Sequence, residues 1–392
     1  MRLIIVVILK DDELFSMHNA THKLTDNNFN GYLLLLVLYI ILKPFYLFPS
    51  GGLQIADIIL IVLFILLIIG QPGLKVCNSE ITLFMLGLCI IVTAISGFWA
   101  ISISDTQMIK PVLFFTFNLI LFFIVSHLIN HYPQTLKYIL GGVIASAFIQ
   151  LTLLPISFSG TVRQTLFFNN PNQLGYWSIA SACIFLYLVQ NVKIPKILYC
   201  LFTVIILILA GLSLSKAATI SILLLYFLYY GNRPLVGMLF ITGLLIAVSF
   251  AGEIEQISNV LSRLSSIGSD SDDNFSGRGY DRIWLAADYI WFGNGEGGYD
   301  RFYRLKGAMS NNELHSTMAM LFFSYGPTGL FVFLAIFIRL FITKGIPPVL
   351  PFIPLLAYGV THQGFRFSFF WLLLAIVSSD FAVNRSRKKQ HN

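Results

Sequence analysis

One short segment of the chain, residues 311–317, carries the side chains best suited to proton transfer. It reads Asn-Asn-Glu-Leu-His-Ser-Thr and leads into an apolar stretch that runs to Tyr325. Histidine titrates near neutral pH, so His315 can accept a proton from a hydroxyl nucleophile. Glu313 can orient His315 or act as the base itself. The alternative is that His315 is a structural residue that only donates and accepts hydrogen bonds. The segment predicts a catalytic base at His315 or Glu313.

Two arginines suited to anion binding lie upstream of this segment. Arg278 and Arg282 are spaced to share one helix face, and Ser276 before them suits a helix N-cap. Guanidinium groups beside a helix N-terminus favour an anion such as pyrophosphate, because arginine binds phosphate oxygens through a bidentate fork. The alternative is that both arginines pair with Asp281, Asp288 or lipid headgroups.

The residues that follow these arginines predict a helix lying on the membrane surface. Apolar side chains recur there at helical spacing, two of them tryptophans: Ile283, Trp284, Ala287, Ile290 and Trp291. The glycine-rich run 293–298 comes next and predicts a flexible loop that opens and closes. It lacks the Lys-Ser/Thr of a phosphate-binding loop, so it does not indicate a nucleotide site.

Further charged residues lie in other connections: Arg163 ahead of residues 167–173, Lys216, and Arg366 close to His362. Charged groups at membrane depth are costly and therefore point to function. The alternative is that they extend toward lipid headgroups. Asp57 is expected to lie at the membrane interface.

The composition requires a membrane to hold these residues. Of the 392 residues, 57% are hydrophobic and only 11% are charged, whereas soluble globular chains carry roughly 25% charged residues. This excludes a soluble enzyme, a nucleic-acid-binding domain and a disordered chain. The four cysteines have neither metal-ligand spacing nor a disulfide pattern.

Apolar stretches long enough to cross a bilayer predict about twelve transmembrane helices. The spans are 32–49, 53–70, 81–102, 109–128, 136–155, 173–190, 195–211, 213–230, 234–250, 327–343, 347–361 and 367–383. The spans 195–211 and 213–230 form either a tight hairpin or one broken helix. Placing both termini in the cytoplasm puts most Lys and Arg of the short connections, with the basic tail 384–389, on the inside.

The predicted fold class is an all-α polytopic membrane protein with one long outside loop carrying short interfacial helices. Residues 1–250 form an N-terminal bundle of about nine helices, and residues 251–312 form the long polar loop with the active-site segment. Residues 313–392 form an interfacial half-helix, the C-terminal transmembrane helices and a basic cytoplasmic tail. The stretch from Glu313 to Phe341 is too long for one straight span. Glu313–Ser324 is therefore expected to be an interfacial or re-entrant half-helix.

Several motifs together resemble the O-antigen polymerase and O-antigen ligase superfamily. In chain order they are Arg163 with Asn170-Pro171-Asn172-Gln173, Ser215-Lys216-Ala217, Ser276-Gly277-Arg278 through Trp284, Phe292-Gly293-Asn294-Gly295, and His315 followed by Ser324 through Leu330. They run from about residue 160 to 335, and their order and shared outside location carry the likeness.

The resemblance implies a GT-C-like glycosyltransferase of the bacterial inner membrane that uses undecaprenyl-pyrophosphate-linked sugars at the periplasmic face. It implies that Arg278 (with Arg282 as the alternative), Arg163 and Lys216 hold the diphosphate, and that His315 activates the acceptor hydroxyl. The lipid diphosphate is a good leaving group, so no nucleotide is needed. The acidic run 269–273 lacks the Gly and terminal Glu of a calcium loop, so a metal-independent reaction without a cofactor is expected. The expected partners are lipid-linked donor and acceptor, membrane lipid, a chain-length regulator and a flippase, without nucleic acid.

The sequence departs from the family pattern at two points. Lys216 stands where arginine is common, which gives up bidentate geometry. His315 is followed by Ser316 and preceded by Glu313, where ligases typically show His-Asn, so the base is open between His315 and Glu313. This departure favours a polymerase of lipid-linked repeat units over a ligase that transfers glycan to lipid A core. A non-enzymatic flippase of lipid-linked oligosaccharides is the alternative from another class.

Overall fold

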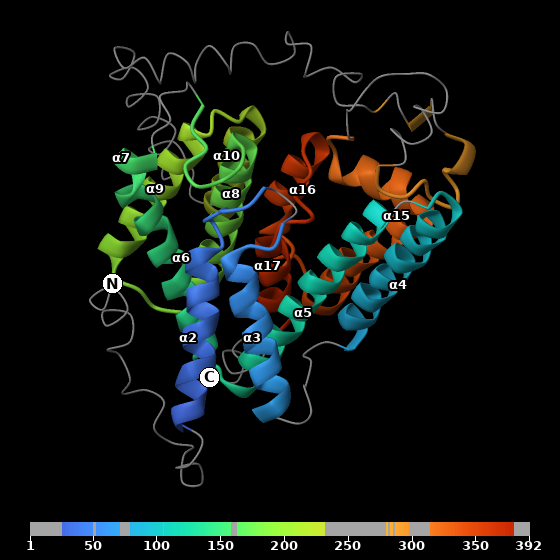
Figure 1. The fold of residues 1–392 in the computed structure, drawn as a ribbon. Helices are drawn as coiled ribbons and strands as arrows, with labels where there is room; N and C mark the ends of the chain where they lie inside the picture. The colour runs from blue at the N-terminus through green and yellow to red at the C-terminus, as the bar shows by residue number, and fades with distance from the viewer. Residues whose placement is uncertain are drawn as a thin grey trace. The chain divides into compact units, whose positions relative to one another are not determined.

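The computed structural model describes residues 26–49, 52–70, 79–104, 106–157, 163–231, 280, 283–284, 287–297 and 314–379 (Figure 1). Every regular element in these ranges is a helix, and they contain no strand. Four helices there are long and apolar enough to cross a membrane: Glu80–Ser102, Thr106–His131, Thr135–Thr152 and Thr317–Lys344. The expected all-helical membrane class is therefore confirmed, while the number of twelve spans and the long outside loop stay predictions.

The chain divides into two compact units. The first unit comprises residues 1–77, 123–213 and 375–392, and the second comprises 78–122 and 214–374. Helices of the first unit are α2 (Asp26–Leu42), α3 (Ile55–Gly70), α6 (Thr135–Thr152), α7 (Leu154–Ser157), α8 (Pro171–Leu188) and α9 (Lys196–Leu212). Those of the second are α4 (Ser79–Ser102), η2 (Thr106–Met108), α10 (Lys216–Tyr230), η4 (Ala287–Tyr289), α15 (Thr317–Lys344) and α16 (Phe352–Thr361). Two further helices, α5 (Ile109–His131) and α17 (Ser368–Ser378), have residues in both units.

A helix lies in each predicted span that falls within the described residues. Two spans are shorter than expected because of proline. Helix α2 ends at Leu42, ahead of Pro44, and α16 begins at Phe352, after three prolines in the preceding connection. Proline cannot donate a backbone hydrogen bond and disfavours helical geometry in the residue before it. The predicted span 234–250 lies outside the described residues.

In the first unit, α2 packs against both α3 and α6, and α8 packs against α6 and α9. Helix α8 is buried along almost its whole length, from Leu174 to Leu188. A helix that is apolar on all faces belongs in the interior of a bundle. This helix begins where its sequence predicts: Asn170 is the N-cap, its side chain accepts from the Gln173 amide at 2.9 Å, and Pro171 occupies the first turn.

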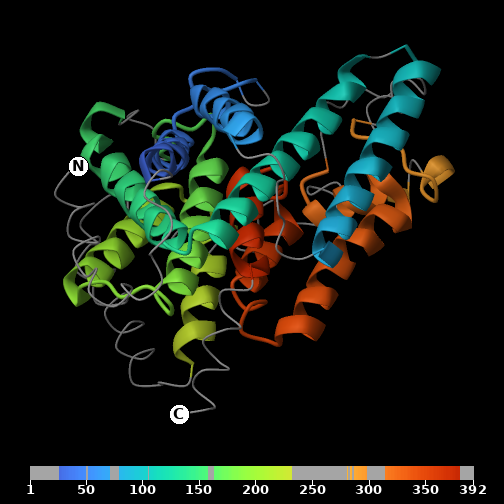
Figure 2. The ribbon, with the colours of Figure 1, turned by 90° about the horizontal axis from the view of Figure 1, so that it is seen from below.

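In the second unit, α4 and α15 run side by side (Figures 1 and 2). At one end the Arg339 guanidinium donates to the Glu80 carboxylate. Further along, a Cβ added to Gly87 would lie 3.9 Å from Val332. Both helices leave large apolar side chains exposed, among them Leu83 and Ile90 of α4 and Phe331, Ile338 and Ile342 of α15. Such faces are what a membrane-spanning pair presents to lipid.

Helix α15 is broken at Gly326, which has φ +67° and ψ −177°, and Pro327 follows the break. The expected division of the stretch from Glu313 to Phe341 is therefore confirmed. The first part begins at Thr317 rather than at Glu313, because Ser316 caps the helix by accepting from the Ala319 amide at 3.3 Å. Its interfacial position stays a prediction.

Candidate functional site

The segment carrying His315 is fixed by hydrogen bonds between the start of α15 and the end of α16. The Ser316 hydroxyl donates to the Gly359 carbonyl at 3.2 Å. The Thr317 hydroxyl donates to the His362 carbonyl at 3.2 Å and accepts from the Gly364 amide at 3.1 Å. His315 itself is exposed directly before these anchored residues. The structure therefore holds the His315 backbone firmly and leaves its side chain accessible.

Tyr280 belongs to the segment that carries Arg278 and Arg282, here called the arginine segment, and it contacts the same end of α16. Its hydroxyl donates to the Val360 carbonyl, next to the Gly359 carbonyl that Ser316 binds. Arg278, Arg282 and Glu313 lie outside the described residues. Tyr280 is the described residue between the two arginines in sequence.

The single apolar stripe expected over residues 283–291 is wrong. Ile283 and Ile290 are buried, whereas Trp284 and Trp291 are 71% and 81% exposed. Residues 287–289 form a 3₁₀ turn and residues 290–292 a turn. A 3₁₀ turn has three residues per turn instead of 3.6, so positions that share an α-helical face separate. Trp284 and Trp291 stay candidates for contact with the membrane surface.

Residues 293–297 are held in place, where the sequence predicts a flexible loop. The Asn294 and Gly295 amides donate to the Phe323 and Ser324 carbonyls, both at 2.9 Å. The Trp99 indole donates to the Gly293 carbonyl at 2.8 Å. These bonds seat the run against the break in α15.

Glycine is required at this contact because the two backbones approach closely. Gly293 has φ +110°, and a Cβ there would lie 2.6 Å from the Ser324 carbonyl oxygen. Across the contact, a Cβ on Gly326 would lie 2.8 Å from the Trp291 carbonyl oxygen. Both distances are below any normal contact, and positive φ is a conformation that glycine adopts without steric cost.

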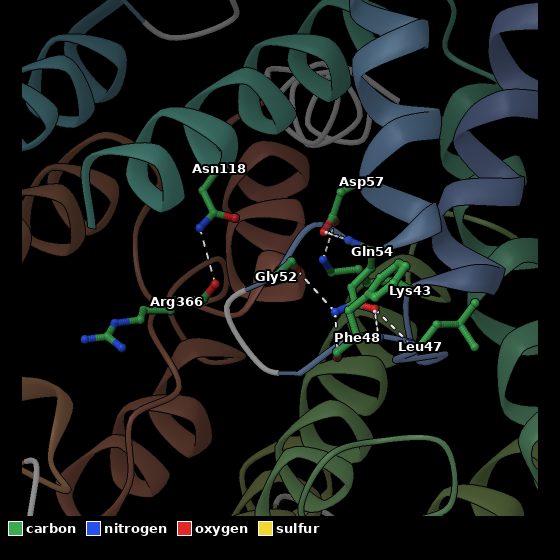
Figure 3. A network of polar contacts seen from close by, with 8 residues as sticks. All are labelled: Lys43, Leu47, Phe48, Gly52, Gln54, Asp57, Asn118 and Arg366. Carbon is green, nitrogen blue, oxygen red and sulfur yellow. Dashed lines mark hydrogen bonds and ion pairs between the residues drawn. The ribbon is translucent and has the colours of Figure 1, made fainter. Parts of the chain in front are cut away.

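This contact creates a polar cluster that the sequence did not predict. Glu296 is buried, accepts from the Tyr325 hydroxyl at 2.7 Å and forms an ion pair with Arg366. The Arg366 carbonyl in turn accepts from the Asn118 side-chain amide at 3.3 Å, and the guanidinium extends away from Asn118 (Figure 3). An acidic residue within the glycine-rich run is a sequence feature that could have indicated a polar contact at Glu296. Its partners could not be identified, because they are distant in sequence.

Arg163 belongs to the first unit, where it joins two connections. Its guanidinium donates to the Asn172 side chain at 2.8 Å and to the Ser213 carbonyl at 3.3 Å. Both acceptors are neutral. The Gln164 amide also donates to the Leu212 carbonyl at 3.0 Å. These hydrogen bonds hold residues 163–173 in a defined conformation that leads into the capped start of α8.

Lys216 occupies the first position of α10, where Ser215 is the N-cap. It is half-buried, and α10 packs against α16. A positive charge at a helix N-terminus opposes the helix dipole. Helix stability therefore does not explain a lysine at this position. Helices α9 and α10 are separate helices joined by a short turn, in which Leu214 has φ +47°.

Asp57 is buried and paired inside the protein, and its expected position at the membrane interface stays a prediction. Its carboxylate accepts from the Lys43 ammonium at 2.5 Å and from the Gln54 backbone amide at 3.0 Å (Figure 3). The second bond is one half of a capping box at the start of α3. The Gln54 side chain accepts from the Leu47 and Phe48 amides at 2.9 Å and 3.1 Å. These contacts explain Lys43 and Asp57 as parts of a rigid loop.

Within the described part of the chain, no three His, Cys, Asp or Glu side chains gather in a way that could hold a metal ion. Comparisons of the whole chain with protein-family models, with curated proteins and with solved structures gave no match.

Proposed function

We propose that the protein is a membrane glycosyltransferase that polymerises undecaprenyl-diphosphate-linked repeat units into O-antigen or capsular polysaccharide at the periplasmic face of a bacterial inner membrane. The observation that carries this proposal is the pair of adjacent α16 carbonyls bound by two distant segments. Val360 accepts from Tyr280 of the arginine segment, and Gly359 accepts from Ser316 beside His315. A cation-bearing segment and an imidazole at one helix end suit a diphosphate leaving group beside a base.

The proposed reaction is a substitution at the anomeric carbon of the growing glycan. A hydroxyl oxygen of the next lipid-linked repeat unit bonds to that carbon. The bond from the carbon to the lipid diphosphate breaks, and the diphosphate leaves with the electron pair. The hydroxyl proton passes to His315 or Glu313. Arginine and lysine side chains stabilise the leaving diphosphate by charge-assisted hydrogen bonds.

The support for a diphosphate-binding role differs among the cationic residues. Lys216 and Tyr280 both lie in the second unit with His315, on α10 and beside α16, which pack together. Arg278 and Arg282 flank Tyr280 in sequence. Arg163 lies in the first unit, and its diphosphate role rests on the resemblance alone.

The test is reconstitution of the full chain in liposomes with an undecaprenyl-diphosphate-linked repeat unit. The proposal predicts a ladder of longer lipid-linked glycans and release of undecaprenyl diphosphate. His315→Ala is expected to lower the rate by roughly 10²–10⁴-fold, the contribution of one general base. His131→Ala, a histidine at the end of α5, is the matched control and should retain activity.

Three other outcomes would contradict the proposal. Transfer only onto an added lipid A core acceptor would show a ligase. Movement of the lipid-linked unit across the bilayer without a new glycosidic bond would show a flippase. Equal rates for wild type and His315→Ala, with Glu313→Ala also unchanged, would remove the assigned base.

A further inference from the structure

The Glu296–Arg366 pair lies within the membrane-crossing length of the α4–α15 pair. The rise from Glu80 to Trp99 along α4 is about 29 Å at 1.5 Å per residue, close to the roughly 30 Å of a hydrocarbon core. Glu80 marks one end through its bond to Arg339, and the Trp99 indole marks the other. Along the unbroken part of α15, Pro327 lies about 18 Å from Arg339, and Tyr325 lies just beyond the break at Gly326. Because Tyr325 donates to Glu296, the carboxylate sits in the part of the span nearer Trp99.

The Trp99 end has the composition of a membrane–water boundary. Trp99 contacts Tyr289 with ring centroids 5.1 Å apart, and Phe98 contacts Phe292 at the same separation. Phe98, Tyr289 and Phe292 are about half exposed, and Trp291 is largely exposed. Tryptophan and tyrosine concentrate at the headgroup level of membrane proteins. The phosphates of a lipid-linked donor lie at this level as well.

Arg366 is held at both of its ends. Its carbonyl accepts from Asn118, which is 3% exposed, and its guanidinium pairs with Glu296. The Glu296 side chain is 7% exposed, while that of Arg366 is 28% exposed. Arg366 also lies in the connection after α16 whose Gly364 amide donates to Thr317, close in sequence to His315. The carboxylate is therefore enclosed, and part of the Arg366 side chain reaches the surface.

We propose that Arg366 is a further residue that binds the diphosphate of the lipid-linked donor, and that Glu296 is the residue that positions it; this rests on the proposed function. A guanidinium carries five N–H donors, so one edge can serve a carboxylate while the other binds phosphate oxygens. From the depth of Glu296 an arginine side chain extends toward the headgroup level. Tyr325 fixes the second carboxylate oxygen, so the guanidinium keeps one orientation.

The experiment measures equilibrium binding of undecaprenyl diphosphate to the full chain in lipid nanodiscs, compared at equal amounts of folded protein. Arg366→Lys keeps the charge and the ion pair but loses the fork, so the Kd is expected to rise about tenfold or more. Arg339→Lys is the matched control, because Arg339 also pairs with a glutamate but at the opposite end of α15. Its Kd should equal that of wild type.

The positioning role of Glu296 has its own variants. Glu296→Asp preserves the charge but shortens the side chain, and Tyr325→Phe removes one hydrogen bond to it. Each is expected to raise the Kd by about threefold to tenfold, the weight of one hydrogen bond. The exchanged pair, Glu296→Arg with Arg366→Glu, should recover folded protein but not binding.

Equal Kd values for Arg366→Lys and Arg339→Lys would overturn the assignment of Arg366. Recovery of wild-type binding by the exchanged pair would show that the two residues have a structural role only. An unchanged Kd in both Glu296→Asp and Tyr325→Phe would overturn the positioning role. Failure of the proposed function is distinguishable, because wild type would then bind undecaprenyl diphosphate without extending glycans, whereas failure of the Arg366 assignment leaves both wild-type binding and extension intact.

Discussion

Gly326 offers the most direct test of how residues 287–297 are joined to the helices of the second unit. Its backbone has φ +67° and ψ −177°, and a Cβ there would lie 2.8 Å from the Trp291 carbonyl oxygen. Gly326→Ala therefore meets two penalties. Holding alanine in this glycine-only conformation costs about 1–3 kcal/mol, and shifting the opposing backbone costs about 1–3 kcal/mol more. The free energy of unfolding is expected to fall by about 2–6 kcal/mol.

Gly97→Ala is the matched control in the same unit. Gly97 lies within α4, and nothing is found within 4 Å of a Cβ added there. Alanine is a better helix former, so this variant should be neutral or more stable by up to about 1 kcal/mol. Both variants are compared with wild type by reversible unfolding in mixed detergent micelles. A loss below about 1 kcal/mol for Gly326→Ala, or equal behaviour of the two variants, would refute the close contact between the loop and the helix break.

Three further outcomes are expected from the first unit. Lys43→Met should lower the free energy of unfolding by about 3–5 kcal/mol, because it leaves the buried Asp57 carboxylate without its cation. Adding Asp57→Leu should recover most of that loss. A double variant whose loss is the sum of the two single losses would contradict the pairing. Asn170→Ala should destabilise by about 0.5–2 kcal/mol through loss of the α8 cap, with Asn170→Asp near wild type; a reversed order in thermal denaturation would contradict the cap. Burial and the Asp57 charge raise the pKa of Tyr46, so the protonated phenol is favoured in the folded state and stability is lost as pH rises above about 10. Tyr46→Phe should make that loss shallower. An identical pH profile of stability for the variant and wild type would contradict the raised pKa.

The helices could be predicted from the sequence because long apolar runs have few alternatives in a membrane protein. The start of α8 could also be predicted, because Asn170 and Pro171 are adjacent residues that favour a helix N-terminus. The ends of α2 and α16 were misplaced because hydropathy alone ignores the loss of hydrogen bonds at proline.

The polar cluster at Glu296 could not be predicted, because each of its contacts joins positions far apart in sequence. Tyr325 and Arg366 reach Glu296 only after α15 breaks and the glycine run docks against it. The same docking explains why the glycines of residues 293–297 do not mean mobility. The missing side chain of Gly293 allows a close backbone contact, and the number of glycines does not distinguish that use from flexibility. The pattern at Trp284 and Trp291 failed because one 3₁₀ turn is enough to change which residues share a face.

The central claim is that the arginine segment and the His315 segment meet around the donor diphosphate, and photo-crosslinking tests it most directly. The full chain in nanodiscs is irradiated with an undecaprenyl-diphosphate-linked oligosaccharide carrying a photoreactive group next to the diphosphate, and labelled peptides are identified by mass spectrometry. Labels are expected in peptides containing Tyr280 and His315, and excess undecaprenyl diphosphate should suppress both. Labels confined to other peptides, or labels that excess undecaprenyl diphosphate does not reduce, would contradict it.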